Sequence, residues 1–556
     1  MGKVWWKEGV GYQVYPRSFQ DSNGDGFGDL QGIVQRLDYL KDLGIDFIWL
    51  SPMYKSPLDD NGYDISDYQE ILEDFGTMAD FDTLLNEVHS RGMRLIIDLV
   101  LNHTSDEHPW FIESRQSKEN AKRDWYIWRD GRDGKEPNNW ESIFGGSAWE
   151  FNEQTNDYFL HVFSRRQPDL NWENPQVRET LYDMVNWWLE KGIDGFRIDA
   201  ISHIKKQPGL PDMPSEGNKK YIPSFDMHMN QEGIMAFLQE FRDKTYGQYP
   251  NAMTVGEANG VTVEEAPQWA GDDGVMDMVF QFEHLDLWDQ EGKKGLDVVA
   301  VKKALTRWQK ALEHDGWNAL FIENHDKARV VSTWGNDTDY WRESATSLAA
   351  MYFLMKGTPY IYQGQEIGMT NGYFTDIEDY DDVAAKNLYR EQTTIDGIPA
   401  ENVLNHLAKT SRDNSRTPMQ WSTDTNAGFT EGTPWLKVNP NFKKVNVANQ
   451  LEDEQSILHF YKKLIQLKKN YALFPYGSYD LLLEDDKQII AYKRQLDDKT
   501  AVVISNLSPS EAEWRSEDNN LTLTSERLVL ANYAVTPHSG LTSFKLKPYE
   551  ARVYIY

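Results

Sequence analysis

Residues 175–199, PQVRETLYDMVNWWLEKGIDGFRID, contain the pattern that decides the fold. Pro175 suits the first turn of a helix, and Gly192 suits the end of one. The apolar residues between them keep the helical spacing of three or four: Val177, Leu181, Val185 and Trp188. The apolar run at 195–199 has the length of a buried strand. The stretch therefore predicts a helix followed by a buried strand.

The same order of helix, glycine and strand occurs twice earlier in the chain, at residues 30–50 and 81–98. Further strands are expected at 12–15, 253–257, 276–280, 319–323 and 359–363. Helices that alternate with apolar strands form a parallel sheet covered by helices. The total of about eight strands is what a (β/α)8 TIM barrel requires. We therefore expect an α/β fold of this type.

Three segments depart from the barrel pattern. Residues 104–171 are rich in Trp, Asn, Asp and Gly, and they are too long for a structureless loop, so we expect an inserted subdomain after the third strand. A second long insertion, 372–419, follows the last strand. Short apolar runs between turns predict a C-terminal antiparallel β domain over 481–556. The barrel then comprises residues 1–103 and 172–480.

Composition and charge exclude several classes of function. The chain has 556 residues, a net charge of −31 and no cysteine. So acidic a chain repels phosphate backbones and anionic lipid, which disfavours nucleic-acid and membrane partners and suits a neutral or cationic small ligand. The lack of cysteine excludes disulfides and thiolate chemistry. Because no membrane-spanning run or signal peptide is visible, we expect a cytoplasmic protein, either a monomer or a homodimer.

Three carboxylates end or closely follow three of the predicted strands: Asp199, Glu257 and Asp326. In a TIM barrel the chemistry lies at the C-terminal ends of the strands. Carboxylates that meet there can cleave glycosides, one as the nucleophile and one as the acid and then the base. Arg197 lies on the same face of its strand as Asp199, where its charge is expected to keep Asp199 ionised. A helix cap or a solvated loop is the alternative for each carboxylate.

Other polar and aromatic residues near these strand ends suit a sugar. His103 and His325 can donate hydrogen bonds to sugar hydroxyls. Four aromatic rings can stack on pyranose rings: Tyr63, Phe144, Phe163 and Phe282. His89 and His108 have no partner pattern and are expected at the surface. The pair Trp187-Trp188 is expected in the core or at an interface.

Several short strings resemble the signature segments of one enzyme family, the α-amylase superfamily or glycoside hydrolase family 13. The resemblance covers essentially the whole chain. In order, the five matching segments are DLVLNH at 98–103, QPDLN at 167–171, GFRID at 195–199, VGE at 255–257 and ENHD at 323–326. The first and last barrel strands are matched by GYQVYP at 11–16 and GTPYIYQGQE at 357–366. The resemblance implies a glycosidase without an organic cofactor.

Within this family the chain is most similar to the branch of oligo-1,6-glucosidases and exo-α-1,4-glucosidases, on NGYDISDY at 61–68 and SRDNSRTPMQW at 411–421. The resemblance implies that Asp199 is the nucleophile, Glu257 the acid/base and Asp326 the residue that holds the substrate hydroxyls.

The resemblance also implies a set of substrate-binding residues. Asp64 and Arg412 are expected to clamp the non-reducing terminal glucose, with Arg416 as the alternative clamp and a structural ion pair as the alternative role for both arginines. The rest of the set comprises Tyr63, His103, Phe144, Phe163, Gln167, Arg197, Ala200, Phe282 and His325.

The expected function is that of a retaining exo-α-glucosidase that releases α-glucose from short α-1,4-linked sugars such as maltose and maltotriose. Family members that prefer α-1,6 bonds commonly have Val at the position of Ala200, and the smaller Ala leaves room for a 4-linked sugar. An oligo-1,6-glucosidase, a trehalose-6-phosphate hydrolase and a sucrose-active transglucosidase remain open. A phosphorylated substrate needs a basic cluster, for which Lys205 and Lys206 are the candidates, although a solvated helix face explains them equally well. A non-enzymatic binding role is disfavoured because all three carboxylates are present.

The segment 21–29 forms a separate signal. Asp21, Asn23, Asp25 and Asp29 occupy positions 1, 3, 5 and 9 of a calcium loop, with glycine at position 6. Position 12 is Gly32 where an EF-hand has Glu, so the loop is not an EF-hand. The resemblance implies a structural Ca²⁺ here, with Mg²⁺ also open, and a ligand role for the carbonyl of Phe27. A metal-free Asx-turn loop is the alternative.

Overall fold

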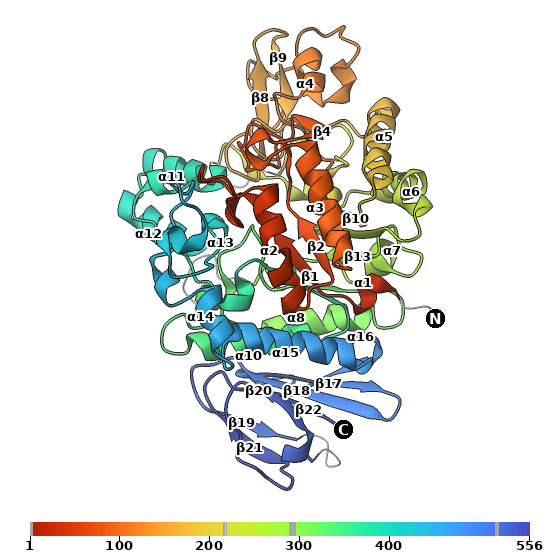
Figure 1. The fold of residues 1–556 in the computed structure, drawn as a ribbon. Coiled ribbons are helices and arrows are strands. Elements are labelled where there is room, and N and C mark those ends of the chain that lie inside the picture. Colours follow the sequence, from red (N-terminus) through yellow and green to blue (C-terminus); the bar gives the residue numbers. More distant parts are fainter. Residues whose placement is uncertain (1–3, 215–216, 218, 288–295, 517–521) are drawn as a thin grey trace.

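Eight parallel strands form a nearly closed barrel in the computed structural model, which describes residues 4–214, 217, 219–287, 296–516 and 522–556 (Figure 1). Their spatial order is β13-β12-β10-β5-β2-β1-β15-β14, and a parallel bridge between Val279 and Asn318 brings the two edges together. The predicted TIM barrel is confirmed. The strands are β1 Gly11–Val14, β2 Phe47–Leu50, β5 Arg94–Val100, β10 Gly195–Asp199, β12 Met253–Glu257, β13 Met278–Phe280, β14 Ala319–Leu320 and β15 Thr358–Tyr362.

The helices around the barrel begin and end where local chemistry predicts. The helix α5 starts after Asn174, whose side chain accepts the N–H of Gln176, and has Pro175 in its first turn. It ends at Gly192, which has a φ of 102° that a side chain would disfavour. The larger barrel helices are α2 Leu30–Leu43, α3 Met78–Ser90, α5 Pro175–Lys191, α6 Ile234–Lys244, α7 Ala266–Ala270, α8 Val298–Ala311, α10 Trp341–Phe353 and α15 Ile457–Asn470.

Smaller elements join or extend these. They are α1 Trp5–Glu8, β3 Tyr54–Lys55, β4 Asp67–Ile71, α9 Val330–Thr333, α14 Val447–Glu452 and α16 Leu473–Tyr476. Two predicted strands are shorter than expected. Strand β13 begins at Met278, and β14 ends at Leu320; the chain beyond β14 carries Asp326.

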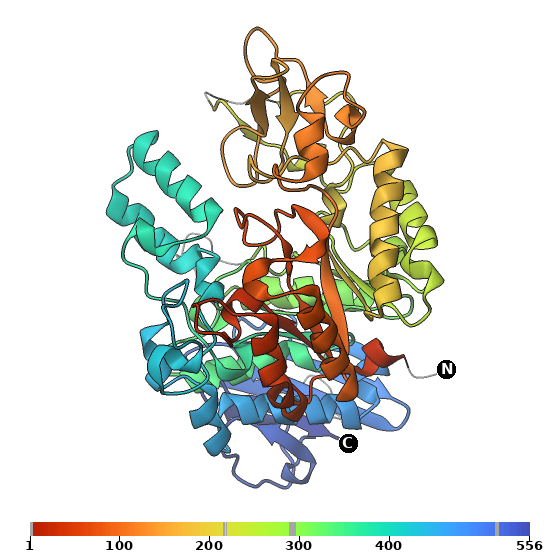
Figure 2. The ribbon, with the colours of Figure 1, turned by 45° about the horizontal axis from the view of Figure 1, so that its top comes forward.

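Residues 104–171 form a small unit at one end of the barrel (Figure 2). It contains α4 Pro109–Ser114, the short strand β7 Trp140–Glu141, and a three-stranded sheet of β6 Trp128–Arg129, β9 Asp157–Leu160 and β8 Trp149–Asn152. A bridge between His103 and Asp169 closes its base. The loop after β10 joins it, since β11 Ile222–Pro223 pairs with β7.

The second insertion is helical and contains α11 Val383–Thr394, α12 Ala400–Thr410 and α13 Asp413–Arg416. The C-terminal β domain lies at the opposite end of the molecule from residues 104–171 (Figure 1). It begins at Ser478, slightly before the predicted boundary. Its strands are β16 Ser478–Leu482, β17 Ile489–Leu496, β18 Lys499–Asn506, β19 Ala512–Arg515, β20 Leu528–Ala531, β21 Ser543–Leu546 and β22 Ala551–Ile555, paired antiparallel.

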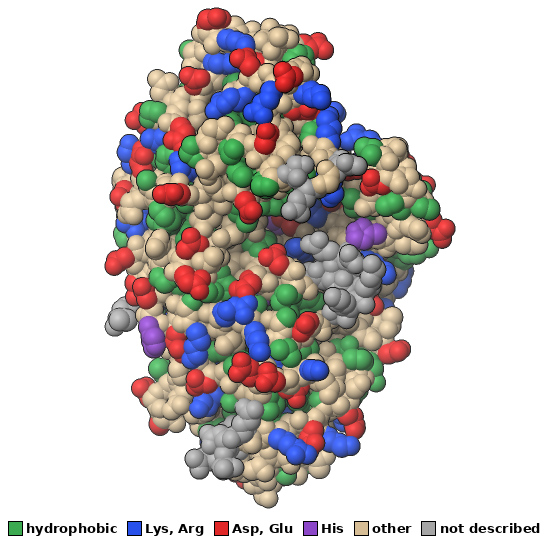
Figure 3. Space-filling model, turned by 180° about the vertical axis from the view of Figure 1, so that it is seen from behind, with side chains coloured by type: hydrophobic (Ala, Val, Ile, Leu, Met, Phe, Trp, Pro, Cys, Tyr) green, Lys and Arg blue, Asp and Glu red, His purple; other side chains and the backbone are tan. Residues whose placement is uncertain are grey.

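The surface carries charges of both signs. Acidic and basic side chains are interspersed over most of the face that Figure 3 shows. Among the described residues, no helix is both long enough and apolar enough to cross a membrane.

Candidate active site

Strand β10 carries the centre of the site at its C-terminal end. The Nη1 of Arg197 donates to both oxygens of Asp98, at 2.9 and 3.1 Å, and to Oδ1 of Asp199 at 2.7 Å. Its Nη2 donates to Oε2 of Glu257. Asp98 is on β5 and Glu257 on β12, the two strands that flank β10. One guanidinium therefore joins carboxylates from three adjacent strands.

The cluster around Arg197 contains more negative than positive charge. Burial raises the pKa of Asp199 well above its usual value; Arg197 lowers it, while Glu257 and Asp98 raise it further. Burial also raises the pKa of Asp98 to about 6. The expectation that Arg197 keeps Asp199 ionised stays a prediction: Arg197 lowers the pKa of Asp199, but the guanidinium is shared with Asp98 and Glu257, and burial opposes it. Like charges this close titrate together, so the raised pKa values of Asp98 and Asp199 belong to the pair and not to either carboxylate alone.

Asp326 has the opposite environment. It accepts hydrogen bonds from Nη1 of Arg412 at 3.2 Å and from Nη2 of Arg416 at 3.0 Å, and Nε2 of His325 lies 3.1 Å from its Oδ2. Burial alone would raise the pKa of Asp326. His325, Arg412 and Arg416 outweigh burial and hold the pKa of Asp326 well below its usual range. Asp326 is therefore ionised at neutral pH.

The two predicted histidines are buried and uncharged at neutral pH. Burial lowers the pKa of His103 to about 4 and that of His325 to about 3. The Nε2 of Gln13 donates to Nδ1 of His325 at 2.8 Å, so the hydrogen of His325 is on Nε2, which faces Asp326. The Nε2 of His103 lies 3.1 Å from the carbonyl oxygen of Tyr63, the residue whose ring stacks on His325. Both rings can thus act as neutral hydrogen-bonding groups.

Aromatic rings surround these polar groups. The ring of Tyr63 stacks on His325 with centroids 5.1 Å apart, and its hydroxyl donates to Asp98 at 3.0 Å. Phe282 lines the same cavity as Arg197 and Glu257. The predicted aromatic residues Phe144 and Phe163 lie on the inserted side, 5.8 Å apart, and the ring of Phe163 is 5.0 Å from that of His103.

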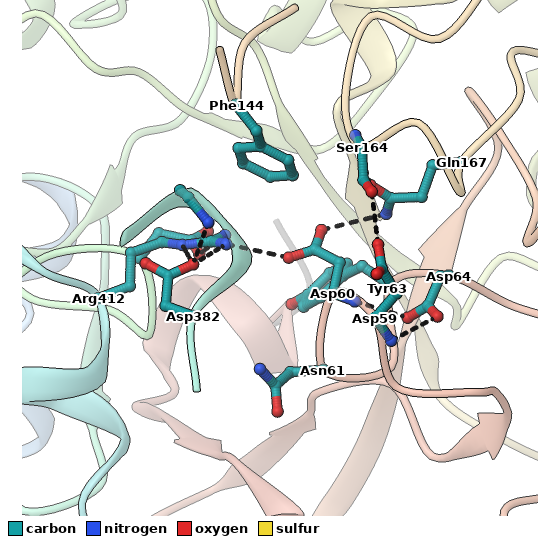
Figure 4. Close-up of polar contacts among 12 residues, drawn as sticks. Asp59, Asp60, Asn61, Tyr63, Asp64, Phe144, Ser164, Gln167, Asp382 and Arg412 are labelled. Atoms are coloured by element: carbon teal, nitrogen blue, oxygen red, sulfur yellow. Dashed lines mark hydrogen bonds and ion pairs between the residues drawn. The ribbon is translucent and has the colours of Figure 1, made fainter. Parts of the chain in front are cut away.

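Arg412 lies between Asp382 and Asp60, below the ring of Phe144 (Figure 4). Its Nη2 donates to Asp60 at 3.0 Å and to Asp382 at 2.6 Å, and its Nη1 reaches Asp326. The ring of Phe144 lies 4.8 Å from the guanidinium carbon. Arg412 thereby connects Asp326 with two carboxylates from distant parts of the chain.

Asp64 does not pair with Arg412, which corrects the predicted clamp. Its side chain is fully buried, and its carboxylate accepts the backbone N–H groups of Asp59 and Asp60 at 2.7 and 3.0 Å and the hydroxyl of Ser56 at 3.0 Å (Figure 4). Burial raises the pKa of Asp64 to about 7. Asp64 shapes the loop, and Asp60 is the residue that this loop presents to Arg412.

Gln167 and Arg416 are buried residues that hold other residues of the site in place. Gln167 is fully buried and donates to Oδ2 of Asp60 at 3.1 Å. Arg416 is also fully buried; its Nε donates to the carbonyl oxygen of His325 at 2.9 Å. Arg416 therefore fixes the position of Asp326 and His325, and Arg412 is the arginine that contacts the Asp60 loop.

A model of the α-amylase catalytic domain matches residues 13–477. The chain belongs to the α-amylase family. It is a glycoside hydrolase of family 13, and the carboxylates that meet around Arg197 are the groups that glycoside hydrolysis needs.

Named relatives match the chain over essentially its whole length. The chain is 58% identical to a probable oligo-1,6-glucosidase 3 of Bacillus subtilis, over 100% of both chains. It is 53% identical to an oligo-1,6-glucosidase of Parageobacillus thermoglucosidasius, over 100% of this chain and 99% of the relative. An α-glucosidase of Pediococcus pentosaceus is 48% identical, over 99% of this chain and 98% of the relative.

Solved structures of other family members have the same fold. A trehalose-6-phosphate hydrolase of Bacillus licheniformis has a TM-score of 0.93 and is 44% identical over 100% of both chains. A trehalulose synthase has a TM-score of 0.94 and is 40% identical, over 99% of this chain and 100% of that one.

Three carboxylates of this family 13 site were not assigned from the sequence. Asp98 lies in a quoted segment, and the structure places its fully buried carboxylate on β5, in contact with Arg197. Asp60 directly precedes the NGYD string at 61–64, so its place in the sequence could have marked it as a candidate site residue. Asp382 lies in the insertion 372–419, and only the folded structure brings it to Arg412.

The lysines considered for phosphate binding are both engaged. Lys206 is 8% exposed, pairs with Asp169 at 2.6 Å and donates to Asn102 at 2.8 Å. Lys205 pairs with Glu173 at 2.6 Å. They therefore do not form a free basic cluster.

The loop at residues 21–29 is held by its own hydrogen bonds. The Asp21 carboxylate accepts from three backbone N–H groups of the loop and from the hydroxyl of Thr430, and the side chains of Asn23 and Asp25 each accept the N–H two residues on. Asp29 caps α2 through the N–H of Gly32.

The described loop contains no preformed metal cage. No group of three or more His, Cys, Asp or Glu side chains stands ready to hold a metal among the described residues. Asp21 and Asp29 are nevertheless buried, and neither pairs with a described cation. Burial raises the pKa of Asp29, and the charge of Asp21 adds to this. Burial also acts on Asp21, but the hydrogen bonds from Thr430 and from the loop backbone outweigh it and lower the pKa of this carboxyl.

Proposed function

We propose that the chain is an exo-acting oligo-1,6-glucosidase, which releases glucose from the non-reducing end of short α-1,6-linked sugars such as isomaltose. The observation that carries the α-glucosidase part is the carboxylate cluster around Arg197, joined through Asp326 to Arg412 and Asp60. The linkage rests on the relatives, several of which are named oligo-1,6-glucosidase. We give the names of these relatives more weight than the α-1,4 preference expected from Ala200.

In this proposal the reaction has two displacement steps. The carboxylate of Asp199 attacks C1 of the terminal glucose, while Glu257 gives its proton to the glycosidic oxygen, and the reducing-side sugar leaves. Water then attacks C1 of the covalent intermediate. Glu257 takes a proton from that water, and the bond to Asp199 breaks with its electron pair, which regenerates the carboxylate. Arg197 contacts both carboxylates and so fixes their separation.

The remaining groups hold the glucose. Asp326 stays ionised and accepts hydrogen bonds from sugar hydroxyls, and the Nε2 hydrogen of His325 donates to them. Charge-assisted hydrogen bonds of this kind are about twice as strong as neutral ones. Arg412 and Asp60 bind the hydroxyls at the far side of the ring, next to Phe144. A terminal glucose fills this end, so the enzyme removes single glucose units.

An α-1,4-glucosidase is the second candidate, because of Ala200. This residue is 3% exposed and directly follows Asp199, and its N–H lies 3.4 Å from Oε2 of Glu257. In this proposal the side chain at position 200 lies beside the glycosidic bond that is cleaved. Its size therefore affects whether a 1,4- or a 1,6-linked sugar fits. A single methyl or methylene group in such a pocket changes specificity by about 10- to 200-fold.

The substrate profile decides between these candidates. We expect kcat/KM for isomaltose to exceed that for maltose, as the names of the relatives suggest. Both values should exceed that for trehalose-6-phosphate, because Lys205 and Lys206 are already paired and leave no free basic cluster for a phosphate. A preference for maltose would reverse the order of the two candidates. A preference for trehalose-6-phosphate would reject both.

Ala200→Val should raise the ratio of kcat/KM for isomaltose to that for maltose by about 10-fold or more. Ala200 has a φ of 42°, in the left-handed region, which disfavours a β-branched side chain. The variant should therefore also unfold at a lower temperature. Ala200→Gly is the matched control, since it removes the strain without filling the space. An unchanged ratio in Ala200→Val would show that this side chain does not set the linkage.

We also propose that the loop at 21–29 binds a structural Ca²⁺ through Asp21, Asn23, Asp25, Asp29 and the carbonyl oxygen of Phe27. An ion that binds only the folded state stabilises it by mass action. EDTA should therefore lower the Tm, and added Ca²⁺ should restore it, while activity at low temperature persists. The EDTA concentration must be one that strips metal from a calcium-binding control protein. If the Tm is then the same with and without EDTA, the hydrogen bonds of the loop stabilise it without a metal ion.

A further inference from the structure

A second pocket, with a volume of about 460 Å³, lies outside the active site. Three elements that are distant in the sequence form it: β4, the start of α4 and the outer face of α5. Figure 1 shows these elements beside one another on the flank of the barrel. Its main lining residues are Asp67, Gln69, His108, Trp110, Asp183 and Trp187.

His108 supplies a polar group to this pocket. The sequence placed His108 at the surface, but the structure leaves it only 5% exposed. Its Nδ1 accepts the backbone N–H of Trp110 at 3.1 Å, so its hydrogen is on Nε2. Burial lowers the pKa of His108 to about 3, which keeps the ring neutral. Within the described part of the chain, Nε2 has no hydrogen-bond partner. A donor in the wall of a pocket that no protein group accepts from is available to water or to a ligand with an acceptor group.

Two tryptophans provide ring surface and further donors. Trp110 packs on His108 with ring centroids 4.2 Å apart. Trp187 is half-buried and stands on edge against the core residue Trp188, at 4.8 Å. Neither Trp110 nor Trp187 donates its indole N–H to another described residue. Large aromatic rings with a free polar edge are suited to ligands that have both apolar and polar surfaces.

Acceptors complete the pocket. Asp183 is exposed on α5 and forms no ion pair with a described residue. One carboxylate oxygen of Asp67 accepts the N–H of Gln69 at 2.9 Å, and its other oxygen accepts no hydrogen bond from a described residue. Two carboxylates disfavour an anionic ligand, and the ammonium group of Lys191, which lies 5.5 Å from the centroid of the Trp187 ring, disfavours a cationic one. A neutral molecule with many hydroxyl groups satisfies both the N–H donors and the carboxylate acceptors.

We propose that this pocket is a second carbohydrate-binding site, which holds one or two glucosyl units of a neutral α-glucan. The faces of a pyranose carry C–H groups that stack on indole rings, and its rim carries hydroxyls that both donate and accept. The volume lies in the range of small-molecule sites. The pocket contains no residue of the catalytic cluster, so it binds sugar without cleaving it.

The test counts bound sugar by equilibrium dialysis with labelled maltotriose and, separately, isomaltotriose. Asp199→Ala is the background, since it binds sugar but does not consume it. Adding Trp187→Ala should remove one equivalent of bound sugar per chain, or weaken its Kd at least tenfold. Trp187→Phe retains a ring and should restore much of the binding. Trp5→Ala, which removes a half-buried tryptophan elsewhere, should leave the count unchanged.

A control separates this site from the catalytic one. In the otherwise native protein, Trp187→Ala should hydrolyse p-nitrophenyl α-glucoside within about twofold of the native rate, which also shows that the variant is folded. The proposal is overturned if Trp187→Ala binds the same number of sugars as its background with the same Kd. It is also overturned if Trp5→Ala loses the same equivalent.

Discussion

Asp199→Ala should lower kcat for any α-glucoside on the order of 10⁵-fold, which is the scale on which a covalent nucleophile contributes. The variant should remain folded, and its Tm should be equal to or above that of the native enzyme. The reason is that Asp199, Asp98 and Glu257 share one guanidinium, so the substitution removes the repulsion between Asp199 and the other two carboxylates. Initial rates with p-nitrophenyl α-glucoside and a melting curve measure both effects.

A small anion distinguishes a nucleophile from a merely structural carboxylate. Azide fits in the space that the alanine leaves and attacks C1 from the same side as Asp199. With an activated substrate, Asp199→Ala plus azide should therefore yield β-glucosyl azide. Residual activity within tenfold of the native rate, or a stable variant in which azide gives no such product, would contradict the assignment of Asp199.

Arg412→Met should lower kcat/KM by about 10³-fold, because losing one partner of a buried charge pair costs about 2–5 kcal/mol. Methionine keeps much of the length of the arginine but leaves Asp60, Asp382 and Asp326 without their shared cation. The Ki of glucose as a product inhibitor should rise along with the KM, since the clamp is proposed to hold the terminal glucose.

Asp60 and Asp64 provide a matched pair for the same claim. Asp60→Asn should weaken glucose binding, since Asp60 contacts Arg412 directly. Asp64→Asn should mainly lower the Tm, because the Asp64 carboxylate accepts two backbone N–H groups inside its loop. If Asp64→Asn impaired glucose binding more than Asp60→Asn, the clamp drawn from the structure would be wrong.

The sequence predicts those features that depend on local chemistry. The periodic apolar residues of 175–188 and the left-handed Gly192 fix a helix and its end within a few residues, and a strand must follow. Arg197 and Asp199 share a face because alternate residues of a strand do so. The signature strings then assign the carboxylates at the strand ends. These parts of the fold and the site could be predicted without coordinates.

Other parts depend on contacts that no local pattern contains. Which of Asp60 and Asp64 faces Arg412 is decided by how the loop folds, and both are acidic residues in the same short string. Asp382 reaches the site only through the packing of an insertion. The burial of His108 follows from the docking of α4 against β4 and α5, so a lone histidine in a loop gave no indication of it.

The anomeric form of the first product tests the central claim most directly. Two successive displacements at C1, the first by Asp199 and the second by water, return the glucose to its original α configuration. Proton NMR of a fresh isomaltose hydrolysate, recorded before mutarotation proceeds, should show α-glucose as the initial product. If β-glucose appeared first, water would be attacking C1 directly, and the roles given to Asp199 and Glu257 would be wrong.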